Sequence, residues 1–166
     1  LLVAAIMCVG VFAATQVTIN GEGKITFTAE DVFATVTIDN QADGEGVSDG
    51  VRTWTFDATN NPGTSLTEAL NFKSMAIDPA TYSTTLTITV KNNQEAGGEA
   101  IVANLAVTSN NTELVTVEST PSYTIEAGAE ATTITVKFNL TEKAKQQGLG
   151  ADGVTFNFVL TLARAA

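Results

Sequence analysis

Residues 83–92 read STTLTITVKN, and the alternation of threonine with apolar residues in this stretch decides the fold class. In an extended chain, Leu86, Ile88 and Val90 fall on one face and the intervening threonines fall on the other. Threonine is β-branched, so it fits a pleated surface and supplies an outward polar group without a charge. The stretch therefore predicts a strand with one face in a hydrophobic core.

The same period of two recurs along most of the chain. It is found in VFATVTID (32–39), RTWTFD (52–57), EAIVANLAVTS (99–109), ELVTVES (113–119), TTITVKFNL (132–140) and VTFNFVLTL (154–162). The core faces expected of the first and the last are Val32, Ala34, Val36 and Ile38, and Val154, Phe156, Phe158, Leu160 and Leu162. With the stretches before residue 31, the pattern predicts about eight to ten strands.

Turn residues separate these runs, for example in DNQADGEGVSDG (39–50) and NNQEAGGE (92–99). One short helix is predicted at TEKAKQQG, where Thr141 can cap the first turn and Gly148 can end the last. The sequence thus predicts an all-β protein, an immunoglobulin-like or jelly-roll β-sandwich with one short helix and an extended apolar N-terminal segment. We expect residues 1–28 to be a donor segment and linker and residues 29–166 to be the sandwich domain.

Composition argues against several classes of function. The chain of 166 residues has no histidine, one cysteine and a net charge of -10. Histidine-based catalytic triads and zinc sites are excluded, and the basic surface typical of nucleic-acid binding is missing. We expect no enzymatic activity and no cofactor.

An acidic, glycine-rich loop is the one weak candidate for a metal site. Its hard oxygen ligands are Asp39, Asp43, Glu45 and Asp49. Counted from Asp39, Gly50 stands at position twelve, where the calcium loop of an EF-hand needs a bidentate Glu. The mismatch favours a solvated hairpin loop over a calcium site.

Two sequons, at Asn110 and Asn139, would accept N-linked glycans in a glycosylating environment. Short sequons arise often by chance in a chain this rich in Asn and Thr.

The opening residues 1–14, LLVAAIMCVGVFAA, resemble the apolar region of a secretory signal. They are too few to span a bilayer of about 30 Å as a helix, but as a strand they would be more than about 40 Å long. If the segment is retained, it needs a partner surface, because exposed apolar area is unfavourable in water. Its candidate interface residues are Leu1, Leu2, Val3, Ile6, Met7, Val9, Val11 and Phe12.

A retained strand of this kind suggests donor-strand addition between neighbouring subunits. The donor supplies main-chain hydrogen bonds and apolar side chains to an incomplete sheet of the next copy. Because donor and acceptor surfaces differ, the contact does not close on itself and propagates as a fibre. We therefore expect the partner to be the chain itself, in an extracellular, cell-surface filament with no membrane in the assembled state.

Two stretches carry a family resemblance: ITFTAEDVFATVTID (25–39) and LNFKSMAIDPATYSTTLTITVKNN (70–93). With the apolar opening, they resemble the camelysin and TasA-like secreted proteins. Glu30 and Asp31 stand where that family usually has a glycine, and Ala80 stands in place of its Pro-Gly turn. The resemblance implies a sandwich that polymerises into biofilm matrix fibres, as is also the case for archaeal bundling pili. Some relatives are described as metallopeptidases, and the lack of histidine argues against that activity here.

Two other functions stay open at this stage. One is a type IV pilin-like subunit with an N-terminal helix in a filament core, which Gly10 and the β-branched residues of the segment disfavour. The other is a secreted adhesin or an S-layer-associated binding domain.

Overall fold

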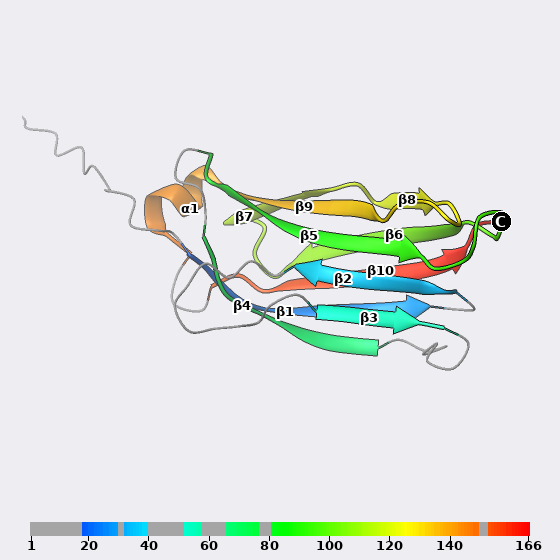
Figure 1. The fold of residues 1–166 in the computed structure, drawn as a ribbon. Helices are drawn as coiled ribbons and strands as arrows, with labels where there is room; N and C mark the ends of the chain where they lie inside the picture. The colour runs from blue at the N-terminus through cyan, green and yellow to red at the C-terminus, as the bar shows by residue number, and fades with distance from the viewer. Residues whose placement is uncertain (1–17, 30–31, 40–51, 58–65, 77–80, 150–152) are drawn as a thin grey trace, which may run out of the picture.

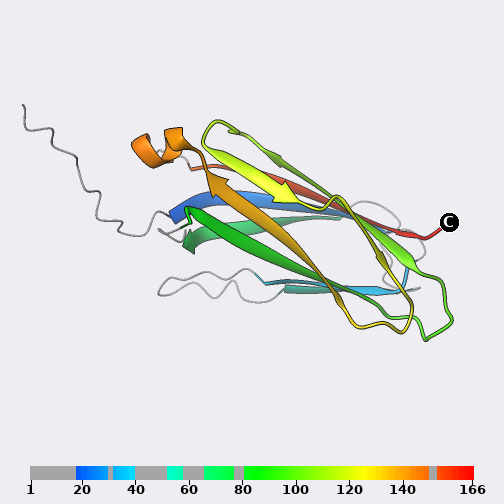
Figure 2. The same ribbon diagram turned by 90° about the horizontal axis from the view of Figure 1, so that it is seen from above.

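The described part of the chain is a sandwich of two five-stranded sheets with one short helix (Figure 1). A computed structural model describes residues 18–29, 32–39, 52–57, 66–76, 81–149 and 153–166. The all-β sandwich predicted from the sequence is therefore confirmed. Figure 2 separates the two layers, with β1 (blue) and β10 (red) in one and β5 (green) and β9 (orange) in the other.

Sheet A has the strand order β4-β1-β10-β6-β8. Its strands are β4 (Leu66–Ala76), β1 (Thr18–Ala29), β10 (Phe156–Arg164), β6 (Ile101–Ser109) and β8 (Ser122–Ile125). β1 and β10 are parallel, whereas the other described pairs of this sheet are antiparallel. The first and last described strands of the chain thus lie side by side.

Sheet B has the strand order β3-β2-β5-β9-β7, and its described pairs are antiparallel. Its strands are β3 (Arg52–Phe56), β2 (Ala34–Asp39), β5 (Ser83–Asn92), β9 (Thr132–Leu140) and β7 (Val115–Ser119). Among the described strands, only β2 and β3 follow one another within a sheet, and the other successive strands alternate between the two sheets. This alternation brings residues that are close in sequence to opposite sides of one core.

β1 is an internal strand of the sandwich. Residues 18–28, which the sequence pattern assigned to the donor segment and linker, form most of it, between β4 and β10 of the same chain. Residues 1–17 lie outside the described part of the chain.

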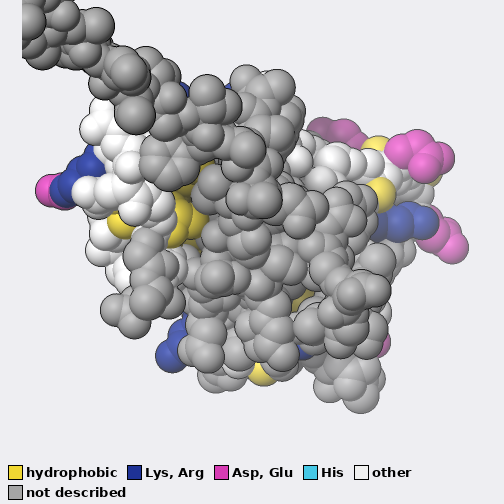
Figure 3. All heavy atoms as spheres, turned by 90° about the vertical axis from the view of Figure 1, so that its left-hand side faces the viewer, with side chains coloured by type: hydrophobic (Ala, Val, Ile, Leu, Met, Phe, Trp, Pro, Cys, Tyr) yellow, Lys and Arg dark blue, Asp and Glu magenta, His cyan; other side chains and the backbone are white. Residues whose placement is uncertain are grey.

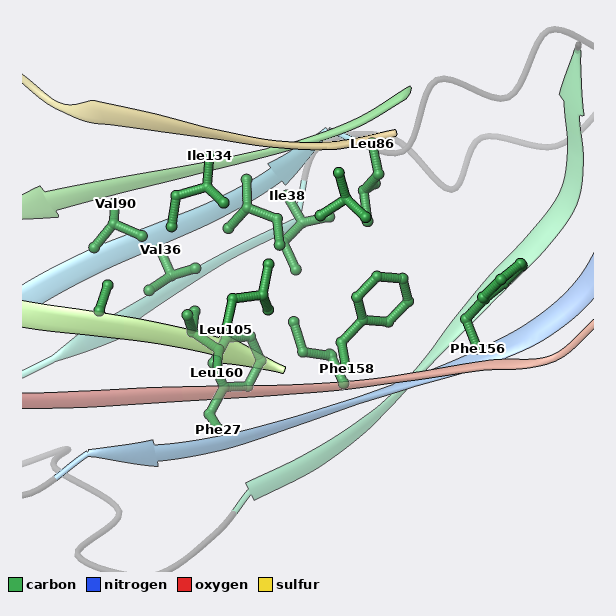
Figure 4. Close-up of a cluster of buried hydrophobic side chains, with 14 of the residues drawn as sticks. Phe27, Val36, Ile38, Leu86, Val90, Leu105, Ile134, Phe156, Phe158 and Leu160 are labelled. Carbon is green, nitrogen blue, oxygen red and sulfur yellow. The ribbon is translucent and has the colours of Figure 1, made fainter. Parts of the chain in front are cut away.

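The core lies between the sheets, where side chains from both layers meet (Figure 4). The predicted inward faces are confirmed: Val36 of β2, Ile88 of β5 and Phe158 of β10 are fully buried. Aromatic rings link the layers, since the ring centroid of Phe138 lies 4.6 Å from that of Phe156 and 6.3 Å from that of Phe158. Burying such large apolar side chains supplies most of the driving force for folding.

The predicted helix forms at one end of the sandwich, which we call the helix end. α1 spans Glu142–Gln147, and the Thr141 hydroxyl accepts a hydrogen bond from the Ala144 N–H, as the capping prediction requires. Gly148 ends the helix with a φ of 77°, a value that a residue with a side chain rarely adopts. Figure 1 places the C-terminus at the opposite end, which we call the loop end.

Candidate functional site

The proposed donor residues, Leu1 to Phe12, lie outside the described residues. The same holds for the candidate calcium ligands Asp43, Glu45 and Asp49, and for the side chain of Asp39. Strands β2 and β3, which flank that acidic loop, pair with one another as a hairpin requires.

The two sequons lie in different surroundings. Asn110 is exposed just after β6, and its Oδ1 accepts a hydrogen bond of 3.0 Å from the Thr155 N–H. Asn139 lies within β9, and its Nδ2 donates to Glu118 Oε1 at 3.0 Å. A glycan on Asn139 would have to displace the bond to Glu118, so of the two sequons Asn110 is the more accessible in the folded protein.

The loop end is organised by one buried polar side chain, Asn92. Its Nδ2 donates to the carbonyl oxygens of Glu99 (3.0 Å) and Ile125 (3.2 Å), and its Oδ1 accepts from the Gln94 N–H (3.1 Å). The side chain is 1% exposed and is the one buried polar residue among those described. Because these bonds hold the β5–β6 loop onto the end of β8, the role of Asn92 is structural.

The sequence shows that β5 ends in Asn, but this role of Asn92 was not predicted from it. The signal was present, because Asn92 continues the inward series of Leu86, Ile88 and Val90. A polar residue at an inward position must find hydrogen-bond partners inside the fold.

A shallow depression of about 580 Å³ lies over this loop. It is lined by Phe33, Asn93, Gln94, Glu95, Ala96, Gly98, Glu99 and Arg164. Several of its polar groups are already bonded within the protein: Asn93 Nδ2 to Thr35 Oγ1, Gln94 Oε1 to the Glu99 N–H, and Arg164 to Glu99. These polar groups of the lining thus stabilise the loop and its surroundings, which makes the depression a weak candidate for a ligand site.

Within the described ranges, no three His, Cys, Asp or Glu residues lie close enough together to hold a metal ion. In the same part of the chain no helix is long and apolar enough to cross a membrane.

Four strands form the lateral edges of the sheets: β3 and β4 on one side, and β7 and β8 on the other. The second side is built from one continuous stretch, residues 115–125, which we call the edge segment. Its first part pairs with β9 over residues 136–140, and its last part pairs with β6 over residues 101–104. The edge segment thus covers half of each sheet edge.

Partly buried hydrophobic side chains mark both lateral sides. They are Trp54 and Leu66 beside β3 and β4, and Val107, Val117 and Tyr123 beside the edge segment. Trp54 packs its ring 4.7 Å from that of Phe27, so it belongs to the core, as its place in the RTWTFD pattern indicates.

The helix end is held by polar contacts between α1 and the β6–β7 loop. Thr141 Oγ1 donates to the carbonyl oxygen of Glu113 at 2.5 Å, and Lys143 forms an ion pair with the Glu113 side chain. The hydrogen bond from Lys143 and its positive charge lower the pKa of the Glu113 carboxyl. In Figure 3, which looks onto this end, charged side chains of the described residues lie mainly towards the rim.

No family model, no curated protein and no solved structure matches this chain. Its candidate function therefore rests on its own sequence and geometry.

Proposed function

We propose that this chain is the structural subunit of an extracellular filament, a pilus or a biofilm matrix fibre. In this proposal the apolar N-terminal segment of one subunit adds as a strand to a sheet of its neighbour. Two features together carry the proposal: residues 1–14 are almost wholly apolar, and one lateral side of the sandwich is covered by described strands only in part.

The described core supports this arrangement. From Ile25 onward the chain supplies its own two-sheet core, and β1 sits within sheet A. All the described strands of both sheets are therefore formed by residues that follow the apolar segment in the sequence. Added to an exposed sheet edge of another copy, it would gain backbone hydrogen bonds and bury its side chains together.

The surface composition also supports association of subunits through contacts that involve no charged side chains. Outward positions of sheet B are largely threonine, for example Thr53 opposite Thr37 and Thr89 opposite Thr133. A net charge of -10 keeps free subunits apart at long range, so the contact that joins them has to be apolar and hydrogen-bonded.

The test is assembly of the full chain. We expect the exported protein to form fibres in negative-stain electron microscopy, with residues 1–14 present in the assembled material by intact mass. The double variant Ile6→Asp with Val9→Asp should form no fibres, because two charges would have to be buried.

The matched control is Thr53→Asp with Thr55→Asp, which adds the same charge on the exposed outer face of β3. This control should assemble. Monomeric wild-type protein, or fibres that lack residues 1–14, would contradict the proposal.

A further inference from the structure

We propose that β6 residues 106–109, the half of the sheet A edge with which no described strand pairs, are the site that accepts the apolar N-terminal segment of a second copy. We call these four residues the open edge. The inference rests on the proposed function and assigns its acceptor.

The open edge begins where the edge segment leaves sheet A. β8 pairs with β6 from Ile101↔Ile125 to Asn104↔Ser122, and the last bond is from the Leu105 N–H to the Pro121 carbonyl oxygen at 2.9 Å. The part of the edge segment that precedes Pro121 in the sequence lies in sheet B as β7, where it pairs with β9. The remaining part of β6 pairs with β10 on one side and with no described strand on the other.

The direction of the backbone groups follows from the alternation of an antiparallel ladder. The Leu105 N–H points towards β8, whereas the Asn110 N–H points the other way, to the Thr155 carbonyl oxygen at 3.0 Å. Because successive residues of a strand alternate, the N–H and C=O groups of Val107 and Ser109 point to the same side as those of Leu105. No described residue pairs with them there, so they present a short ladder for an added strand.

The side chains beside this ladder are apolar. Val107 of the open edge and Val117 of β7 are only partly buried, although both pack against the core. An added strand would cover them while it pairs with β6, which combines the two sources of affinity in strand addition. The open edge itself carries no charge, and neither do residues 1–14.

The corresponding gap in sheet B lacks this apolar character. β7 covers β9 only from residue 136 onward, so residues 132–135 have no described neighbour on that side. Their inward side chain, Ile134, is already fully buried, and Thr133 and Thr135 face outward. An added strand would bury little apolar surface there, which favours β6 over β9 as the acceptor.

The occupant follows from length, position and composition. β1 starts at Thr18 at the helix end, the end to which the open edge also belongs, and residues 1–17 precede it. Residues 1–14 can extend over about 46 Å as a strand, at about 3.3 Å per residue, which is more than the four-residue ladder requires. An uncharged apolar segment of a second copy therefore matches the open edge in chemistry and in reach.

The acceptor can be located by photocross-linking in assembled fibres. A benzophenone amino acid would replace one exposed threonine at a time: Thr108 in the open edge, Thr135 in the sheet B gap, or Thr67 on β4. Isotope-labelled and unlabelled subunits are mixed, and cross-linked peptides are identified by mass spectrometry. We expect Thr108→benzoylphenylalanine to capture residues 1–14 of a differently labelled copy and the other two positions to capture little.

A matched valine pair tests the same site by assembly. Val107→Lys places a charge in the partly buried acceptor, whereas Val159→Lys places it on the outer face of β10, where Val159 is 41% exposed. We expect the first variant to lose fibres while its circular dichroism remains that of a folded β protein, and the second to assemble like the wild type.

The outcomes separate this inference from the proposed function. If wild-type fibres form but the cross-links map to Thr135 or Thr67, or join residues 1–14 to the same copy, the open edge is not the acceptor and the filament proposal survives. Normal assembly of a folded Val107→Lys variant also overturns the assignment. If the wild-type chain forms no fibres at all, the proposed function fails, and the acceptor assignment fails with it.

Discussion

At the loop end of the sandwich one buried amide joins the ends of three strands, whereas at the helix end the half-edge without a described partner lies beside partly buried apolar side chains. Asn92 satisfies two carbonyl oxygens and one N–H of the loop end within a single side chain. At the helix end Val107 and Ser109 present backbone groups that no described residue meets. The comparison teaches that the two ends of the same pair of sheets are built differently: each leaves half of one sheet edge without a described partner, but the loop end is held by a buried polar side chain, and the helix end has partly buried apolar ones.

The largest expected effect is the loss of the amide that closes the loop end. Asn92→Ala would remove the partner of the buried Ile125 carbonyl oxygen and those of the partly buried backbone groups of Glu99 and Gln94, so we expect about 3 kcal/mol of lost stability. The measurement is urea unfolding of the monomer. The neighbouring Asn93→Ala removes only an exposed bond to Thr35 and should cost well under half as much. Equal effects at the two positions would refute a special role for Asn92.

A second pair of variants examines how closely the loops of this end approach one another. A Cβ on Gly128 would lie 2.8 Å from backbone atoms of Ala96, and its φ of +74° is itself unfavourable for alanine. We expect Gly128→Ala to destabilise by about 2 kcal/mol, from clash and strain together.

Gly97→Ala is the second variant of the pair and the matched control for Gly128→Ala. Gly97 has a φ of +92°, but a Cβ added there would meet no atom within 4 Å, so only the backbone strain of about 1 kcal/mol is expected. Thermal unfolding would show the difference as a lower midpoint for the Gly128 variant. A larger loss for the Gly97 variant would contradict the close approach of the two loops.

At the helix end, removing the cap of α1 should have a smaller effect. Thr141→Ala loses the bond from the Ala144 N–H and the bond to the Glu113 carbonyl oxygen, so we expect about 1 kcal/mol of destabilisation. Thr141→Ser keeps the hydroxyl and should restore most of the stability. If the Thr141→Ser and Thr141→Ala variants are equally stable in urea unfolding, the hydroxyl contributes nothing to stability.

The smallest effect concerns the exposed ion pair between Lys143 and Glu113. The pKa of Glu113 is lowered in the folded state, so its contribution is present at pH values above the unfolded pKa and is lost as the pH falls through the folded pKa. Glu113→Gln should therefore be slightly less stable than the wild type at neutral pH and equal to it in acid. High salt should shrink the neutral-pH difference. A stability difference that grows in acid would contradict the lowered pKa.

Sequence patterns located most strands but not all of them. Two strands lacked a usable signal: β8 is only four residues long, and the alternation in β4 is imperfect, as LTEALNFKSMA shows. Strands that are short or irregular in pattern are stabilised by the neighbours they pair with, which local patterning does not reveal.

By itself the sequence determined the fold class, the inward faces of β2, β5 and β10 and both ends of α1. These features depend on local spacing: a period of two selects a strand face, and Thr141 and Gly148 satisfy a helix through neighbours a few residues away. Only the tertiary structure decided that β1 lies parallel to β10, that Asn92 closes the loop end and that residues 106–109 have no described partner beyond β10. Each of these depends on contacts between segments far apart in the chain, and a period of two does not specify which strands become neighbours.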